Sequence, residues 1–99
     1  MKIEIVEAFL NGGPENNEAI GLVGEWSAKQ EARVIEGLLT PVDFELERFN
    51  LFKESGLMDY AEEALRDAWR IASGEGDQEL ADGIRDRFME NGFLIPEGE

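Results

Sequence analysis

Asp and Glu are the residues of this chain whose type and spacing indicate a possible binding function. Acidic side chains recur at intervals of three, four and seven residues in two segments. Successive helical residues are turned by about 100°, so these intervals place the acids on one face of a helix. The first row comprises Asp43, Glu47 and Glu54; the second row comprises Glu79, Asp82, Asp86 and Glu90. We expect both rows to bind a partner.

The chemistry that we assign to the two rows is docking on a surface rich in Lys and Arg. Like charges four residues apart destabilise an isolated helix by about 0.2–0.5 kcal/mol per pair, so their repetition favours a function. Phe44 and Leu51, on the same segment as the first row, are predicted to add an apolar contact with the partner. A solvated face that keeps an acidic protein dispersed is the other interpretation, and it stays open.

Other chemistry is restricted by composition. The chain has no Cys and no His, which excludes thiolate nucleophiles, Ser-His-Asp triads and sulfur or imidazole metal ligands. The acids near Asp77 lack the spacing of a calcium-binding EF-hand loop, and Gly74-x-Gly76 lacks the third glycine of a dinucleotide loop. A carboxylate pair needs a deep cleft to raise one pKa, which a small domain rarely builds. We therefore expect no enzyme activity, catalytic residue, cofactor or metal.

The net charge indicates what the chain binds. It has 9 Lys and Arg against 23 Asp and Glu, a formal net charge of −14. This charge repels nucleic acids and anionic membranes at long range, so we predict no direct binding to either. It attracts basic proteins or ribonucleoproteins, whose grooves hold phosphates with Lys and Arg. The N-terminal residues 1–7 place acids among apolar residues, unlike a signal peptide, and a cytoplasmic protein is the expectation.

Length and helix signals predict a mainly α fold. The 99 residues fit a single acidic domain, residues 1–99. Three helices are predicted from capping residues and following glycines: 41–55 after Thr40, 60–73 after Asp59, and 78–91 after Asp77. We expect a compact helical bundle of four to six helices, with residues 96–99 as a frayed tail.

The first forty residues allow two folds. The pattern Ser27-Ala28-Lys29-Gln30 resembles a capping box and predicts a helix over 28–38. Its inward face would carry Ala28, Ala32, Ile35 and Leu39. Residues 18–26 form either a helix weakened by glycine or an irregular strand. Residues 3–10 favour a helix, and the alternative is an α+β fold with a β-hairpin through 11–17.

The segment after Thr40 has more apolar surface than one helix face can bury. Val42, Leu46 and Phe49 form one stripe, whereas Phe44 and Leu51 lie well away from it. The helix is therefore either central and covered on two sides, or part of an interface with a partner or a second copy.

In size, acidity and lack of catalytic motifs the chain resembles small phage-encoded inhibitor proteins, which include DNA mimics and anti-CRISPR proteins. The resemblance covers class properties and no shared motif, so it transfers no residue assignment. It implies a protein that covers a basic surface of nucleic-acid-handling machinery and blocks access of the nucleic acid. The alternative function is a homodimeric structural or regulatory subunit of a bacterial or phage assembly, held by an apolar helix face.

Overall fold

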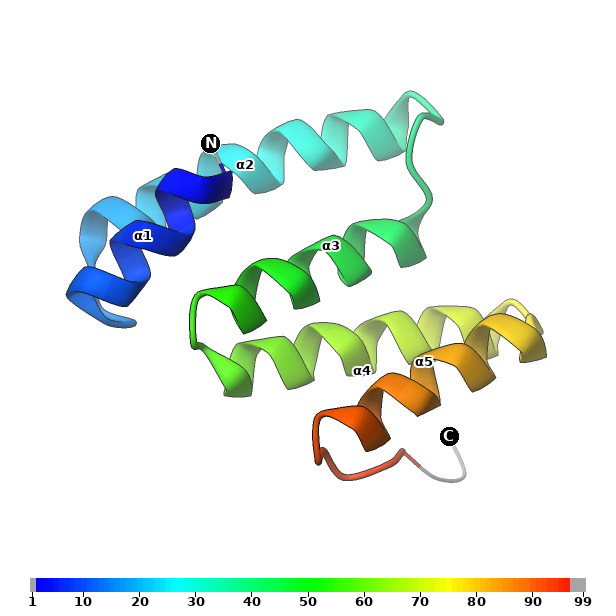
Figure 1. Cartoon of the computed structure of the whole chain (residues 1–99). Helices are drawn as coiled ribbons and strands as arrows, with labels where there is room; N and C mark the ends of the chain where they lie inside the picture. Colours follow the sequence, from blue (N-terminus) through cyan, green and yellow to red (C-terminus); the bar gives the residue numbers. More distant parts are fainter. Residues whose placement is uncertain (1, 97–99) are drawn as a thin grey trace.

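The computed structural model describes residues 2–96, and all regular structure within that range is helical. The helices are α1 (Lys2–Gly12), α2 (Asn17–Ile35), α3 (Pro41–Glu54), α4 (Met58–Gly74) and α5 (Gln78–Glu90), shown in Figure 1. This confirms a mainly α bundle of four to six helices. The alternative with an N-terminal β-hairpin is wrong, because α1 and α2 occupy that region as two helices.

The turn between α1 and α2 is closed by Asn16. The Asn16 side-chain amide donates to the carbonyl oxygen of Ala8 at 2.9 Å, and its Oδ1 accepts from the backbone N–H of Glu18 at 3.0 Å. Gly13 has a φ of 75°, which a side chain would strain. One residue thus caps α2 and ties it to α1, which favours a helical hairpin over paired strands.

Helix α2 continues unbroken through Gly21 and Gly24, so the predicted boundary at Ser27 is wrong. Ser27 lies inside the helix, where its backbone is helical and cannot serve as an N-cap. The buried side of α2 carries Ala19 and Trp26. The predicted inward face is also wrong for the residues Ala28, Ala32 and Ile35, which are exposed, while Leu39 is half-buried.

The cap predictions for α3 and α5 are confirmed, and the one for α4 is wrong. Thr40 Oγ1 accepts from the Asp43 N–H at 3.0 Å, and Asp77 Oδ1 accepts from the N–H at position 80 at 3.1 Å. Helix α4 instead begins at Met58, so Asp59 lies in its first turn, where a carboxylate favours the positive end of the helix dipole.

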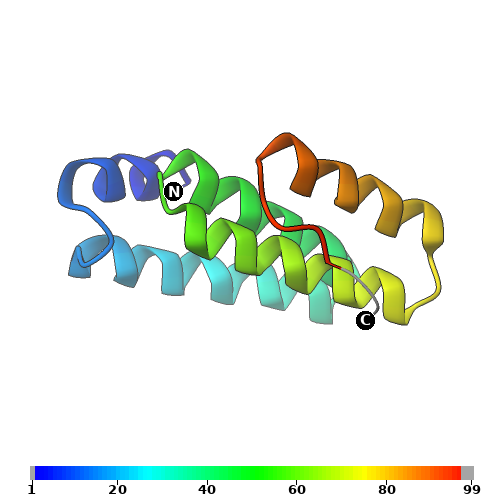
Figure 2. The ribbon, with the colours of Figure 1, turned by 90° about the horizontal axis from the view of Figure 1, so that it is seen from below.

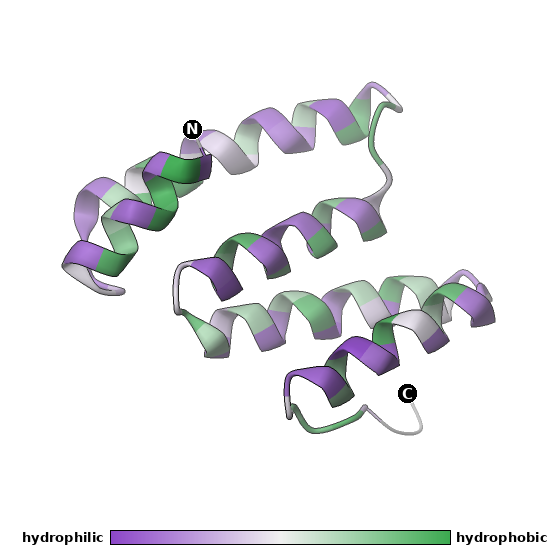
Figure 3. Ribbon diagram, viewed as in Figure 1, coloured by the Kyte–Doolittle hydropathy of each residue, from purple (hydrophilic) through white to green (hydrophobic). Residues whose placement is uncertain are grey.

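Helix α3 is central and is covered on two sides. Its residues Val42, Phe49 and Phe52 pack into one cluster with residues of α4 and α5. Leu51, on another face, is fully buried in a second cluster with residues of α1 and α2. Figure 3 shows green, hydrophobic positions on several faces of α3. Most of the wide apolar arc is therefore buried within one chain, while Phe44 and Leu46 are half-buried.

The helices form a flat slab of 38 × 34 × 17 Å. Seen from below, α1 and α5 lie on one side of the slab and α2 on the other (Figure 2). The C-terminal segment packs back on the core through Phe93, whose ring meets Phe49 and Phe88 edge to face at 6.5 and 6.2 Å. Pro96 is buried, so the predicted frayed tail does not begin there; its other residues, 97–99, lie outside the described part.

Candidate protein-binding surface on α3 and α5

The three members of the acidic row of α3 differ in their surroundings. Asp43 is exposed and carries no ion pair to a described residue. Glu54 is exposed and pairs with Lys2 of α1, with 3.7 Å between Nζ and Oε2. Glu47 is half-buried, and its Oε2 has neither solvent nor a hydrogen-bond donor among residues 2–96. This row therefore offers one fully free carboxylate.

The acidic row of α5 is exposed along its whole length. All of its members, Glu79, Asp82, Asp86 and Glu90, are exposed, and within residues 2–96 no Lys or Arg forms an ion pair with any of them. Asp82 accepts one hydrogen bond, at 2.8 Å, from the side-chain amide of Gln78. The opposite face of α5 buries Ala81, Ile84 and Phe88, which fixes the direction in which the acids point.

A groove lies between α3 and α5, which run in the same direction because each is antiparallel to α4 (Figure 1). Its volume is about 440 Å³. Leu46 of α3 and Leu80 and Ile84 of α5 supply apolar lining, and Asp77 and Glu79 supply carboxylates. Arg87 also lines it and is its one cation. The groove thus joins the α5 row, through Glu79, to apolar surface contributed by both helices.

The apolar contact predicted for Phe44 and Leu51 is not available on this surface. Leu51 is fully buried, so the prediction that it touches a partner is wrong for this fold. Phe44 is half-buried and stacks on Trp26 with 6.3 Å between ring centroids. Both residues point toward α1 and α2 because α3 is the central helix.

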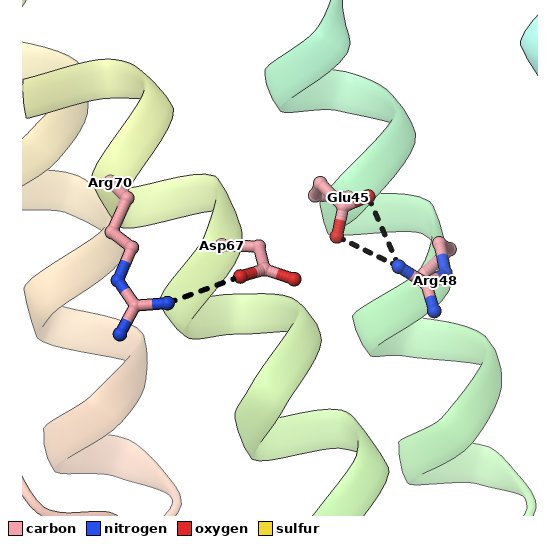
Figure 4. Close-up of polar contacts among 4 residues, drawn as sticks. All are labelled: Glu45, Arg48, Asp67 and Arg70. Atoms are coloured by element: carbon pink, nitrogen blue, oxygen red, sulfur yellow. Dashed lines mark hydrogen bonds and ion pairs between the residues drawn. The ribbon is translucent and has the colours of Figure 1, made fainter. Parts of the chain in front are cut away.

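Glu45, which belongs to neither acidic row, is only 8% exposed. Arg48 Nη1 donates to both of its carboxylate oxygens (Figure 4). The Arg48 guanidinium also lies over the rings of Phe44 and Phe52, 5.9 and 5.5 Å from their centroids. The spacing of Val42, Glu45, Phe49 and Phe52 on one helix face was a signal that could have revealed this burial.

Burial raises the pKa of the Glu45 carboxyl, because desolvation disfavours its charged form. The Arg48 guanidinium lowers the pKa by a smaller amount, while the nearby carboxylates Asp67 and Glu63 raise it further. In Figure 4 Asp67 projects from α4 toward α3 and pairs with Arg70, with 3.5 Å between Oδ1 and Nη1. Each of the two ion pairs lies within one helix, so the electrostatic effect of Asp67 on Glu45 across the α3–α4 contact is repulsive.

No group of three or more acidic residues in the described range is placed to hold a metal ion. None of the helices there has an apolar stretch long enough to span a membrane. Comparisons of the chain with protein-family models, curated proteins and solved structures gave no significant match.

Proposed function

We propose that the chain is a non-enzymatic interaction protein that binds a basic surface of nucleic-acid-handling machinery and blocks access of the nucleic acid. The observation that carries this proposal is the α5 row: exposed carboxylates on one face, with no cation paired to them among residues 2–96. An anti-CRISPR inhibitor is the most concrete form of this function.

The geometry favours pairing with individual Lys and Arg side chains over copying a phosphate track. Glu79 and Glu90 are eleven positions apart, which corresponds to about 16 Å of helix axis. DNA carries one charge per ~1.7 Å of axis, a much closer spacing. The groove beside Glu79 supplies the apolar contact that Leu51 cannot, through Leu46 and Leu80.

The test is a pull-down from bacterial lysate at low and moderate salt, with the bound proteins and RNA identified. Asp82→Lys combined with Asp86→Lys is expected to abolish capture of the partner and leave the helix content intact. The matched control reverses Glu25 and Glu31, two exposed acids of α2, and is expected to retain binding. Binding should weaken sharply with salt because screening acts on exposed charge pairs. The proposal would be contradicted if the α5 double variant still captured the partner. It would also be contradicted if the α5 variant and the α2 control lost capture to the same extent.

A homodimeric structural or regulatory subunit is the second candidate, and one observation favours it. Ile35 and Leu38, at the C-terminal end of α2 and just after it, are 86% and 66% exposed. This apolar surface lies on another helix than the α3 face that carries Phe44 and Leu51, of which Leu51 is buried and Phe44 half-buried. Sedimentation in high salt distinguishes the two functions, because a hydrophobic dimer persists there whereas charge-led association is lost.

A further inference from the structure

An apolar cleft lies where the α1–α2 hairpin meets α3 and α4. Figure 1 shows how these four helices are arranged. The volume of the cleft is about 290 Å³. It is lined from α1, α2, α3 and α4 by Phe9, Ile20, Val23, Phe52 and Tyr60, together with Pro14, Leu57 and Arg48. An adjoining hollow of about 680 Å³ shares Pro14, Leu57 and Tyr60 with it.

The turns beside the cleft are held by hydrogen bonds. Asn16 ties the α1–α2 turn to Ala8 through its side chain and to Gly13 through its backbone N–H, and so positions Pro14. At the other wall, the Leu57 N–H donates to the carbonyl oxygen of Phe52 at 2.9 Å. The cleft therefore requires no rearrangement of the chain to exist, which reduces the ordering cost of binding.

The walls of the cleft offer apolar side chains that the other described residues leave exposed. Ile20 and Tyr60 are 51% and 52% exposed, and Met58 of the adjoining hollow is partly exposed as well. Arg48 is the only cation in the lining, and its charge is matched by Glu45 at 3.0 Å. The wall is thus locally neutral, which suits an apolar group, and clustered exposed apolar residues mark interaction sites.

The rim next to this wall is acidic. Asp59 and Glu63 line the adjoining hollow, are exposed, and form no ion pair with a Lys or Arg of the described residues. We propose that the cleft binds a segment of a partner protein in which one large apolar side chain is flanked by Lys or Arg. The apolar side chain occupies the cleft and the cations pair with the rim. This second docking surface does not depend on the α5 row.

The experiment titrates the isotope-labelled full chain with short Lys- and Ala-based peptides that differ only in a central Phe, Leu or Ala. The Phe and Leu peptides are expected to shift the backbone amide resonances of Ile20, Leu57 and Tyr60 at low salt. The Ala peptide is expected to bind roughly tenfold more weakly, since one buried large side chain contributes about that factor or more. Ile20→Ser should weaken binding of the Phe peptide by a similar factor, whereas Ile35→Ser on the same helix should leave binding unchanged.

Several results would overturn this proposal. The first is equal binding of the three peptides. The second is that amide resonances shift only in α5, or that no peptide shifts the resonances at the cleft. The third is that Ile20→Ser and Ile35→Ser change binding of the Phe peptide equally. Cleft shifts that appear on concentrating the chain without peptide would assign the surface to a second copy instead. The Asp82→Lys, Asp86→Lys variant should still bind the Phe peptide at the cleft, which separates this result from failure of the proposed function.

Discussion

Arg48 uses a single nitrogen, Nη1, to donate to both carboxylate oxygens of Glu45, at 3.1 and 3.0 Å. The Arg48 guanidinium also lies over the rings of Phe44 and Phe52, which belong to the same helix. Burying a carboxylate costs free energy, and pairing and hydrogen bonding to Arg48 offset only part of that cost, since the pKa of Glu45 remains raised by burial. The charge state of Glu45 is therefore coupled to the stability of the contact between α3 and α4.

The first prediction concerns the pH dependence of stability. The folded-state pKa of Glu45 is raised above 4.5, so its contribution to stability is fully present below about pH 4.5 and is lost as the pH rises through the folded-state value. Glu45→Gln removes this dependence. Urea unfolding between pH 4.5 and 7.5 should show the natural chain gaining stability relative to the variant as the pH falls. A constant difference between the two curves would contradict the raised pKa.

The second prediction concerns Arg48→Met. Removing the cation leaves the Glu45 carboxylate buried without a partner, which should destabilise the fold by about 2–3 kcal/mol at neutral pH. This is less than for a fully buried pair because the Arg48 side chain is 32% exposed. The destabilisation should become smaller at low pH, where Glu45 is protonated. The same unfolding series measures it, and a loss independent of pH would point to packing alone.

The third prediction compares glycines of the first two helices. Gly21 and Gly24 lie inside α2, and a Cβ added at either meets open space. Replacement by Ala should raise the free energy of unfolding by about 0.5–1 kcal/mol each, since Ala favours the helix. A Cβ at Gly12 would instead overlap the Asn16 side chain, so Gly12→Ala should destabilise the hairpin. Thermal unfolding of the three variants tests this, and the same sign for all three would disprove it.

The fourth prediction compares two apolar residues whose predicted and observed positions differ. Leu51 is fully buried in the cluster that joins α3 to α1 and α2, so Leu51→Ala should cost about 2–4 kcal/mol. Ile35 is 86% exposed, and Ile35→Ala should change stability by less than about 0.5 kcal/mol. Chemical denaturation checks both values. Similar losses at the two positions would mean that the outer face of α2 is covered in solution.

The sequence alone predicted some local features of the fold correctly and others wrongly. Side chains that bond to the backbone within three residues identified the starts of α3 and α5 at Thr40 and Asp77. The 100° turn per residue likewise placed the α5 acids on one face, and the structure shows that face exposed. The prediction of a helix start at Ser27 was wrong, because a capping pattern inside a long helix has the same sequence as one at a helix start.

What only the tertiary structure decided is which faces of the helices are covered. Periodicity showed that α3 has a wide apolar arc, but not whether α1 and α2 or a partner covers Leu51. For the same reason the sequence did not predict the burial of Glu45 beside Arg48, the groove along Glu79, or the cleft between Ile20 and Tyr60. Helix formation depends on neighbours a few residues apart, whereas coverage depends on contacts between distant segments. The sequence therefore determined where α3 and α5 begin and which face of α5 is acidic, and the packing decided which surfaces remain open.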